Sequence, residues 1–201
     1  GIRMEKFTIT ITRQFGSMGR TIAKKLSEEL GVEFYDRDIV EKVSRQLNLP
    51  VSKISDSEET AHSRFWERMF PLGTDEEYIQ DMIFDVQKEI ILDLAKKSSC
   101  IIVGRCSDAI LENRDNNMNI YVYAPVSKRL ENCVTRLNMD ETEAKRTIAR
   151  VDKARQAYHK KYAGFLPDDS THRQLMIDSS MLGPEETAHW IAQVARKKFN
   201  I

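Results

Sequence analysis

The residues with the most distinctive chemistry form a short loop that contains two glycines and follows an alternating apolar run. The loop consists of Gly16, Ser17, Met18, Gly19, Arg20 and Thr21. Backbone N–H groups at such a turn into a helix bind phosphate oxygens. In the common phosphate loop, G-x-x-x-x-G-K-[ST], a lysine also reaches the terminal phosphates and the hydroxyl group holds Mg²⁺. We therefore expect these six residues to bind the phosphates of a nucleotide.

The loop departs from the common pattern at two positions. Gln14 stands at the first glycine and Arg20 stands at the lysine, whereas Thr21 keeps the hydroxyl group expected to bind magnesium. Arginine keeps the positive charge and adds a planar fork of donors that suits phosphate. A tight strand-to-helix turn that needs two glycines is the structural alternative. The position after the first strand of an α/β chain favours phosphate binding.

Charged residues also follow the other predicted strands. Asp36 and Asp38 come after the second strand, and Arg105 comes after the third. Because ligands of a parallel sheet bind beyond the carboxyl ends of its strands, these side chains are candidates for one common site. A carboxylate such as Asp36 is a suitable magnesium ligand, and an arginine clamps phosphate. The alternatives are a helix N-cap for either aspartate and a surface ion pair for Arg105.

A basic helix is predicted after residue 140. Arg146, Arg150 and Lys153 lie at i, i+4 and i+7, and hence on one face. A solvated charged face explains this pattern, and so does a lid whose arginines close over transferring phosphates. Asp152 and Arg155 are spaced to pair within one turn under either interpretation.

Strands and helices alternate along the chain. Hydrophobic periodicity predicts strands at 7–11, 32–35, 100–103, 119–123 and 175–178, and helices at 21–30, 39–47, 75–97, 127–137, 140–162 and 185–199. This alternation predicts an α/β fold with a parallel sheet and helices on both faces. In the helix at 127–137, the apolar residues expected to face inward are Leu130, Cys133, Val134 and Leu137. The aromatic cluster at 65–70 predicts short helices within residues 51–77 rather than a solvated linker.

Composition limits the partners. The 31 basic and 31 acidic residues cancel, so no global charge points to a nucleic acid or a membrane surface. No apolar run approaches the roughly 20 residues of a membrane span. The three cysteines lack a C-x-x-C spacing and indicate reduced thiols in a cytoplasmic protein. We expect a nucleotide and a small phosphorylated acceptor as partners, and neither nucleic acid nor membrane. A homo-oligomer is compatible with the sequence.

Taken in order, the motifs resemble those of the cytidylate kinase-like family, within the group of P-loop nucleoside monophosphate kinases. The resemblance covers nearly the whole chain and is weakest over residues 51–77. The matching stretches are Ile9-Thr10-Ile11 with Gly16-Ser17-Met18-Gly19-Arg20, Phe34-Tyr35-Asp36, Val103-Gly104-Arg105-Cys106, Val122-Tyr123-Ala124-Pro125 with Arg129, Val151-Asp152-Lys153-Ala154-Arg155, and Ile177-Asp178-Ser179-Ser180.

The resemblance implies a three-layer P-loop NTPase-type fold with a five-stranded parallel sheet, forming one kinase-like domain over residues 1–201. It also implies a helical insertion at 37–98 that binds the acceptor and a basic lid at 140–170. The residues that it implies for catalysis are Arg20, Arg105, Arg150 and Arg155. The residues that it implies for acceptor binding are Asp36, Arg37, Asp38, Arg105 and Asp152.

The activity implied by the resemblance is transfer of the γ-phosphoryl group of ATP to a nucleoside monophosphate, with CMP or dCMP as the best candidates. Mg²⁺ would be held by Thr21 and Asp36. The missing lysine motivates an alternative, a catalytically impaired protein that keeps the kinase fold and binds a nucleotide or phosphate.

Overall fold

The structure is a computed structural model that describes residues 5–36 and 74–201. Several expectations concern residues 37–73 and lie outside the described residues. These are the helix at 39–47, the aromatic cluster at 65–70, and the acceptor-binding roles of Arg37 and Asp38.

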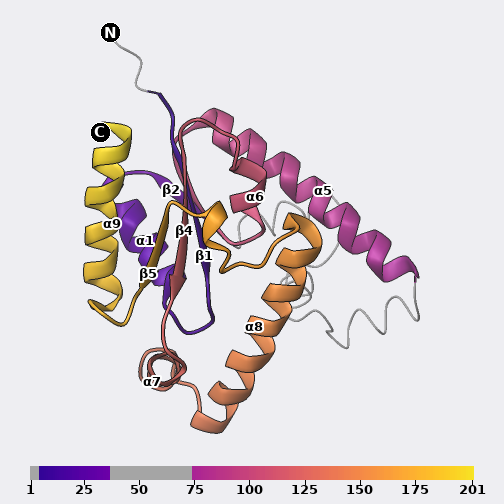
Figure 1. The fold of residues 1–201 in the computed structure, drawn as a ribbon, viewed down its shortest axis with the longest axis vertical. Helices are drawn as coiled ribbons and strands as arrows, with labels where there is room; N and C mark the ends of the chain where they lie inside the picture. The colour runs from indigo at the N-terminus through magenta and orange to yellow at the C-terminus, as the bar shows by residue number, and fades with distance from the viewer. Residues whose placement is uncertain (1–4, 37–73) are drawn as a thin grey trace.

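The chain forms a five-stranded, wholly parallel sheet, which confirms the predicted architecture (Figure 1). The strands are β1 (Thr8–Arg13), β2 (Glu33–Tyr35), β3 (Cys100–Val103), β4 (Asn117–Tyr123) and β5 (Leu175–Asp178). Their order is β2-β3-β1-β4-β5, so β1 lies at the centre. Thr8 of β1 is paired with Cys100 of β3 on one side and with Asn117 of β4 on the other. The carboxyl ends of all strands therefore meet at one edge.

Helices cover both faces of this sheet. They are α1 (Gly19–Leu30), α5 (Thr74–Lys97), α6 (Ser107–Leu111), α7 (Val126–Thr135), α8 (Glu141–Ala163) and α9 (Gly183–Phe199), with a 3₁₀ turn at Ser170–His172. Figure 1 shows α1 and α9 on one face and α5 and α6 on the other. The short α6 was not predicted. Among the described helices, none is both long and apolar enough to cross a bilayer.

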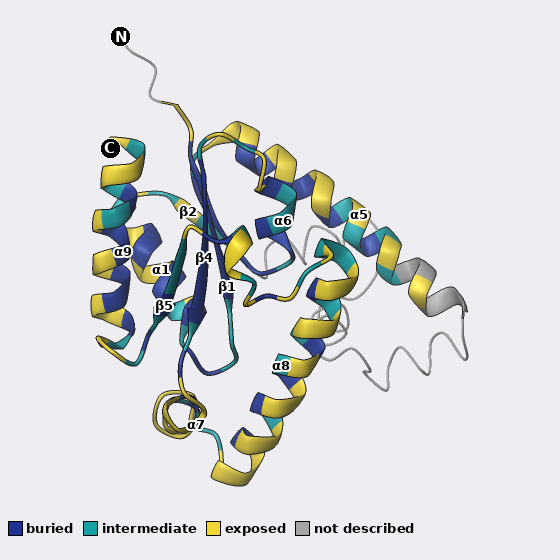
Figure 2. Ribbon diagram, in the orientation of Figure 1, coloured by how far each residue is buried: buried dark blue, intermediate teal, exposed yellow. Residues whose placement is uncertain are grey.

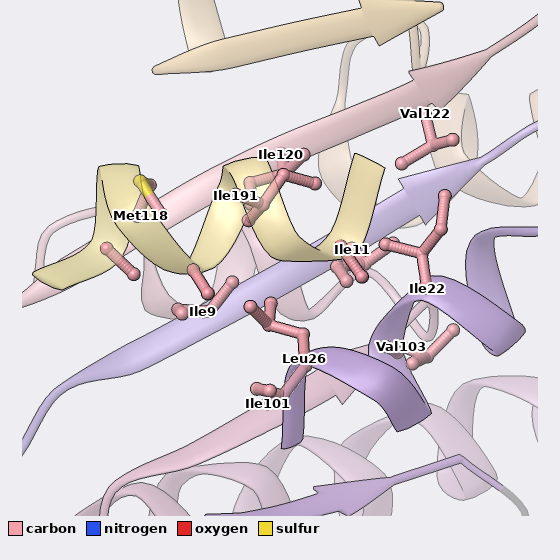
Figure 3. Packing of buried hydrophobic residues seen from close by; sticks show 14 of the residues in the cluster. Ile9, Ile11, Ile22, Leu26, Ile101, Val103, Met118, Ile120, Val122 and Ile191 are labelled. Carbon is pink, nitrogen blue, oxygen red and sulfur yellow. The ribbon is translucent and has the colours of Figure 1, made fainter. Parts of the chain in front are cut away.

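The main hydrophobic core lies between the sheet and the pair α1 and α9. Ile9 and Ile11 of β1 point into it and meet Ile22 and Leu26 of α1 and Ile191 of α9, all fully buried (Figure 3). Burying one such side chain stabilises the fold by about 1.5–3 kcal/mol. Figure 2 shows that burial is concentrated on the strands and on the helix faces that touch them.

The other face of β1 is polar although it is buried. Thr8 Oγ1 donates to Asn117 Oδ1 at 2.8 Å, and Thr10 Oγ1 donates to Asn119 Oδ1 at 2.6 Å. Asn119 Nδ2 in turn donates to the main-chain carbonyl of Asp108 in α6 at 3.0 Å. This threonine–asparagine ladder joins β1, β4 and α6, and each of its side chains has a hydrogen-bond partner.

The inward face of α7 differs from the prediction. Val134 and Leu137 were expected inside, but they are 38% and 43% exposed. Cys133 is buried as expected, and the other buried residue of the helix is Arg129. Hydrophobic periodicity cannot predict a buried guanidinium, because that residue is held by polar partners rather than by apolar contact.

The ladder predicts a large cost for Asn119→Ala. The substitution removes the acceptor of Thr10 and leaves buried polar groups without partners, which costs about 1–3 kcal/mol in free energy of unfolding. Urea denaturation would measure this cost. The matched control is Asn116→Ala, because the Asn116 side chain donates to the exposed Glu5 and its loss should change stability by no more than about 0.5 kcal/mol. Equal effects of the two variants would contradict the role of the ladder.

Candidate active site

The glycine loop (residues 14–19) connects β1 to α1 at the carboxyl edge of the sheet. Gly16 has a φ of 79°, and a Cβ atom there would lie 2.9 Å from the carbonyl oxygen of Arg129. The packing thus requires glycine at this position. Met18 also has a left-handed conformation, with a φ of 67°, which costs a non-glycine residue about 1–2 kcal/mol. The loop therefore holds a defined and partly strained shape.

Helix α1 presents its uncapped N-terminus to a cavity of about 290 Å³. The first N–H groups of an α-helix have no intrahelical partners, and the side chain of the N-cap residue Met18 does not bond to them, so this terminus favours an anion. We call this hollow the phosphate-loop cavity. The predicted residues that line it are Gly16, Met18, Gly19, Arg20, Thr21 and Asp36. Ser17, also predicted to bind phosphate, is buried, and its hydroxyl group donates to the carbonyl of Gln14 at 2.7 Å.

Arg20, at the lysine position of the motif, contacts the end of β2. Its Nε donates to Asp36 Oδ2 at 3.2 Å, and its guanidinium carbon lies 5.8 Å from the ring centroid of Phe34. The Arg20 side chain is 57% exposed. Arg105 Nη2 lies 4.0 Å from the other oxygen of Asp36. The Asp36 carboxylate thus lies between two guanidinium groups.

The turn after β3 holds Arg105 in an unusual backbone conformation. Gly104, Arg105 and Cys106 all have positive φ angles, of 68°, 61° and 55°. Such strain in non-glycine residues persists only where the surrounding structure imposes it, and it is concentrated at functional sites. The Ser107 hydroxyl group holds the turn by donating to the carbonyl of Gly104 at 2.7 Å. The Arg105 side chain is only 9% exposed, which excludes a surface ion pair.

Arg105 borders a second, smaller cavity of about 50 Å³, which we call the strand-end cavity. Its lining includes Thr12 and Arg13 of β1, the Arg105 turn, and Arg155, Tyr158 and His159 of α8. Burial lowers the pKa of the Arg105 guanidinium; Asp36 and Tyr158 oppose this shift and the charge of Arg13 adds to it. Arginine nevertheless stays protonated in proteins. This concentration of cations favours an anionic ligand.

An ion pair between the buried Arg129 and the partly buried Asp152 attaches α7 and α8 to the glycine loop. Arg129 Nη1 donates to Asp152 Oδ2 at 2.5 Å and to the carbonyl of Phe15 at 3.3 Å. The main-chain N–H of Phe15 donates to Asp152 Oδ1 at 2.8 Å. Arg129 Nε also donates to the carbonyl of Ala124 at 2.9 Å. We call this arrangement the loop clamp. Asp152 pairs with Arg129 of the neighbouring helix and is not among the residues that line either cavity.

A second buried network holds the other end of α8. Asp108 Oδ2 accepts hydrogen bonds from His159 Nε2 at 2.7 Å and from Arg173 Nη1 at 2.9 Å. His159 Nδ1 lies 2.6 Å from the carbonyl oxygen of Phe165. Both ring nitrogens of His159 therefore lie within hydrogen-bond distance of an oxygen atom. Arg173 Nη1 also donates to Thr12 Oγ1 at 3.2 Å, which connects the network to β1.

The two arginines predicted on the lid lie in different surroundings. Arg155 Nη1 donates to the carbonyl of Arg13 at 3.4 Å, and Arg155 lines both cavities. Arg150 is exposed on α8 and lines neither cavity. Sequence reasoning gave no site role to Arg13, and it considered Arg129 only as one of the residues that follow the fourth strand. Arg13 ends β1 and Arg129 follows β4, so the position near the end of a strand was the one signal in the sequence that pointed to a site role for them.

Magnesium would find oxygen ligands in the phosphate-loop cavity. Within residues 5–36 and 74–201 there is no group of three or more His, Cys, Asp or Glu side chains placed to hold a metal ion. Thr21 and Asp36 both line the phosphate-loop cavity. Because Mg²⁺ in kinases is held by one or two protein ligands together with substrate phosphates, this hydroxyl and carboxylate fit such an ion.

The loop clamp predicts that Asp152→Ala destabilises the protein strongly. The substitution leaves the buried Arg129 cation without its counter-ion, which costs about 3–5 kcal/mol in free energy of unfolding. The control Glu185→Ala breaks the exposed pair of Arg136 and Glu185 and should cost at most about 1 kcal/mol. Chemical denaturation of the two variants measures the difference. A loss below 1 kcal/mol for Asp152→Ala would exclude the clamp as a structural element.

The Asp108 network predicts acid sensitivity. Burial would raise the pKa of the Asp108 carboxyl, but the hydrogen bond from His159 and the charge of Arg173 outweigh it and lower the pKa. A carboxyl whose folded pKa is depressed stabilises the fold above its unfolded pKa of about 3.9, and this contribution is lost as the pH falls through the folded pKa.

We expect urea midpoints of the wild type to fall steeply below about pH 4. Asp108→Asn should be less stable at pH 7 and show a shallower fall over the same acid range. A fall of the same steepness in the variant would show that Asp108 makes no contribution to acid unfolding.

Comparison with known proteins shows where this fold and site occur. The sequence matches the model of the cytidylate kinase-like family over residues 8–181. A cytidylate kinase from Sulfolobus acidocaldarius is 23% identical over 194 residues, which cover 94% of each chain. It is a relative of this chain at low identity.

Solved structures show the same fold. An uncharacterized protein from Eubacterium ventriosum is similar with a TM-score of 0.71 and 22% identity, over 94% of this chain and 98% of that one. The shikimate kinase from Acinetobacter baumannii, solved in complex with shikimate, has a TM-score of 0.55 and 15% identity, over 95% of this chain and 93% of that one. The fold is that of P-loop kinases. Because the family match runs from β1 to the turn after β5, the chain belongs to the cytidylate kinase-like family.

Proposed function

We propose that the protein is a phosphotransferase that passes the γ-phosphoryl group of ATP to the phosphate of a nucleoside monophosphate, with CMP or dCMP as the first candidates. The observation that carries this proposal is the pair of neighbouring cavities at the carboxyl edge of the sheet, which share Arg13 and Arg155. The phosphate-loop cavity suits the phosphates of ATP. The strand-end cavity, with Arg105, suits the phosphate of the acceptor.

The chemistry of such a transfer matches the residues present. An oxygen of the acceptor phosphate donates an electron pair to the γ-phosphorus, the bond from that phosphorus to the β,γ-bridging oxygen breaks, and its electron pair leaves with ADP. A dianionic acceptor phosphate needs no general base. Catalysis then consists of positioning and of neutralising charge on the phosphoryl oxygens, which arginines do well. In this proposal, Thr21 and Asp36 hold Mg²⁺, which supplies further charge neutralisation.

The proposal assigns separate roles to two segments of the chain. Residues 37–98 form the insertion that binds the acceptor, and residues 140–170 form the lid. Support for the lid comes from α8, because Arg155, Tyr158 and His159 on this helix line the strand-end cavity.

The proposal also assigns the protein to the cytoplasm. Its three cysteines are buried free thiols, and burial raises the pKa of Cys100 to about 11, which makes that thiol unreactive.

One observation favours the alternative, a protein that binds a nucleotide or phosphate without turnover. Arg20 stands where the catalytic lysine of the common motif stands, yet it is paired with Asp36. If no other residue supplies the missing cation, the loop binds phosphate but does not accelerate its transfer. Calorimetric binding of ATP with Mg²⁺, in the absence of turnover, would favour this second function.

A coupled assay of ADP formation tests the primary proposal. With ATP and Mg²⁺ present, we expect turnover with CMP or dCMP and less with UMP, AMP or shikimate. Absence of turnover with every acceptor would overturn the assignment as a phosphotransferase.

Arg105→Met gives a sharper test of the acceptor site. The variant keeps the buried aliphatic stem but removes the charge, and it should raise the KM for the monophosphate by about 10- to 100-fold, as expected for a lost charged hydrogen bond. The KM for ATP should change much less. Arg114→Met is the matched control, because Arg114 precedes β4 and lies at the opposite edge of the sheet. An equal change in both KM values would contradict the division into two cavities.

A further inference from the structure

Arg13 is the last residue of β1 and the point where the two cavities meet. It lines both the phosphate-loop cavity and the strand-end cavity, as does Arg155, which reaches the site from α8. Arg13 is anchored in the central strand of the sheet, whereas Arg155 belongs to the proposed lid. Of these two shared arginines, Arg13 therefore has the more rigid support.

Two glycines make room for the Arg13 side chain. A Cβ atom on Gly19 would lie 2.6 Å from Arg13 Cβ, and a Cβ atom on Gly104 would lie 2.5 Å from Arg13 Nη1. The stem of Arg13 thus passes over the first residue of α1, and its guanidinium ends at the turn that carries Arg105. This path runs from the glycine loop to the strand-end cavity.

Arg20 does not follow such a path. It leaves α1 toward Asp36 and Phe34 at the end of β2, and more than half of its side chain is exposed. Spacing in the sequence assigns Arg20 to the lysine position. The three-dimensional arrangement instead gives a cation between the two cavities to Arg13, seven residues earlier in the chain.

We propose that Arg13 contacts the phosphoryl group during its transfer and supplies the charge that the lysine supplies in the common phosphate loop. This inference rests on the proposed function and names a residue that acts in it. The guanidinium neutralises charge on the γ-phosphoryl oxygens as the bond to ADP breaks and the bond to the acceptor forms. Its planar fork of donors can reach two oxygens at once, which a lysine cannot do.

The test compares Arg13→Met, Arg13→Lys and the control Arg114→Met with the wild type. Methionine keeps an unbranched stem in the space beside Gly19 and removes only the charge. We expect Arg13→Met to lower kcat by about 10²- to 10³-fold, as for other contacts made to a transition state, and to raise the KM for ATP by no more than the factor by which the wild type prefers ATP to ADP. Arg13→Lys should retain more activity than Arg13→Met, and thermal unfolding should be similar for all four proteins.

Binding gives a second readout that does not depend on the acceptor. Calorimetry with ATP and with ADP, each with Mg²⁺, measures how much the γ-phosphate contributes to affinity. We expect the wild type to bind ATP more tightly than ADP and Arg13→Met to lose this preference. This comparison tests Arg13 even if the wild type binds ATP without turnover.

The outcomes distinguish the role of Arg13 from the proposed phosphotransferase function. A wild type that turns over, with an Arg13→Met variant of equal kcat, overturns the role of Arg13 and leaves the proposed function standing. A wild type without turnover that loses its preference for ATP on Arg13→Met overturns the proposed function and supports the Arg13 contact. An unchanged preference for ATP over ADP in Arg13→Met, or a wild type that binds neither nucleotide, overturns the inference.

Discussion

The loop clamp is the interaction on which the site depends most. A buried guanidinium and carboxylate are costly to desolvate, and such a pair is retained only where its geometry satisfies most of its hydrogen bonds. Arg129 and Asp152 meet this condition by bonding to each other and to both polar main-chain groups of Phe15. The pair thus fixes the conformation of the glycine loop and the positions of α7 and α8 at once. An apolar replacement would fill the same volume but could not orient the main chain of the loop.

Arg20 stands at the lysine position of the common phosphate loop, but the cation that we propose to act in its place is Arg13. A spacing rule assumes that the side chain after the second glycine points at the phosphates. Here the residue at that position bonds to Asp36, and an arginine from the strand before the loop borders both cavities. The protein as a whole has no net charge, yet Arg13, Arg105 and Arg155 gather at one small cavity. Local charge, rather than composition, therefore defines what the site can bind.

The sequence predicted the fold well because its signals are local. The apolar run at 100–103 and the alternating run that begins at residue 7 became neighbouring strands, and the helical periodicity of 75–97 gave α5 almost to the residue. The rule that ligands bind at strand ends directed attention to the edge of the sheet at which both cavities lie. The Asp108–His159 pair could not be predicted, because its members are 51 residues apart and nothing in either segment indicates the other. Arg13 was missed because no sequence pattern gives the direction of a side chain.

The central place of β1 has a consequence for how the chain folds as it is made. Residues Thr8–Arg13 are synthesised well before their two partner strands, which begin at Cys100 and Asn117. The hydrogen bond from the Phe15 N–H forms later still, because its acceptor Asp152 lies 137 residues later in the chain. At about 5–20 residues per second, that interval lasts roughly 7–30 seconds. For the first part of this interval, until β3 and β4 have been made, β1 has no neighbouring strand, so the newly synthesised chain carries an unpaired and aggregation-prone strand.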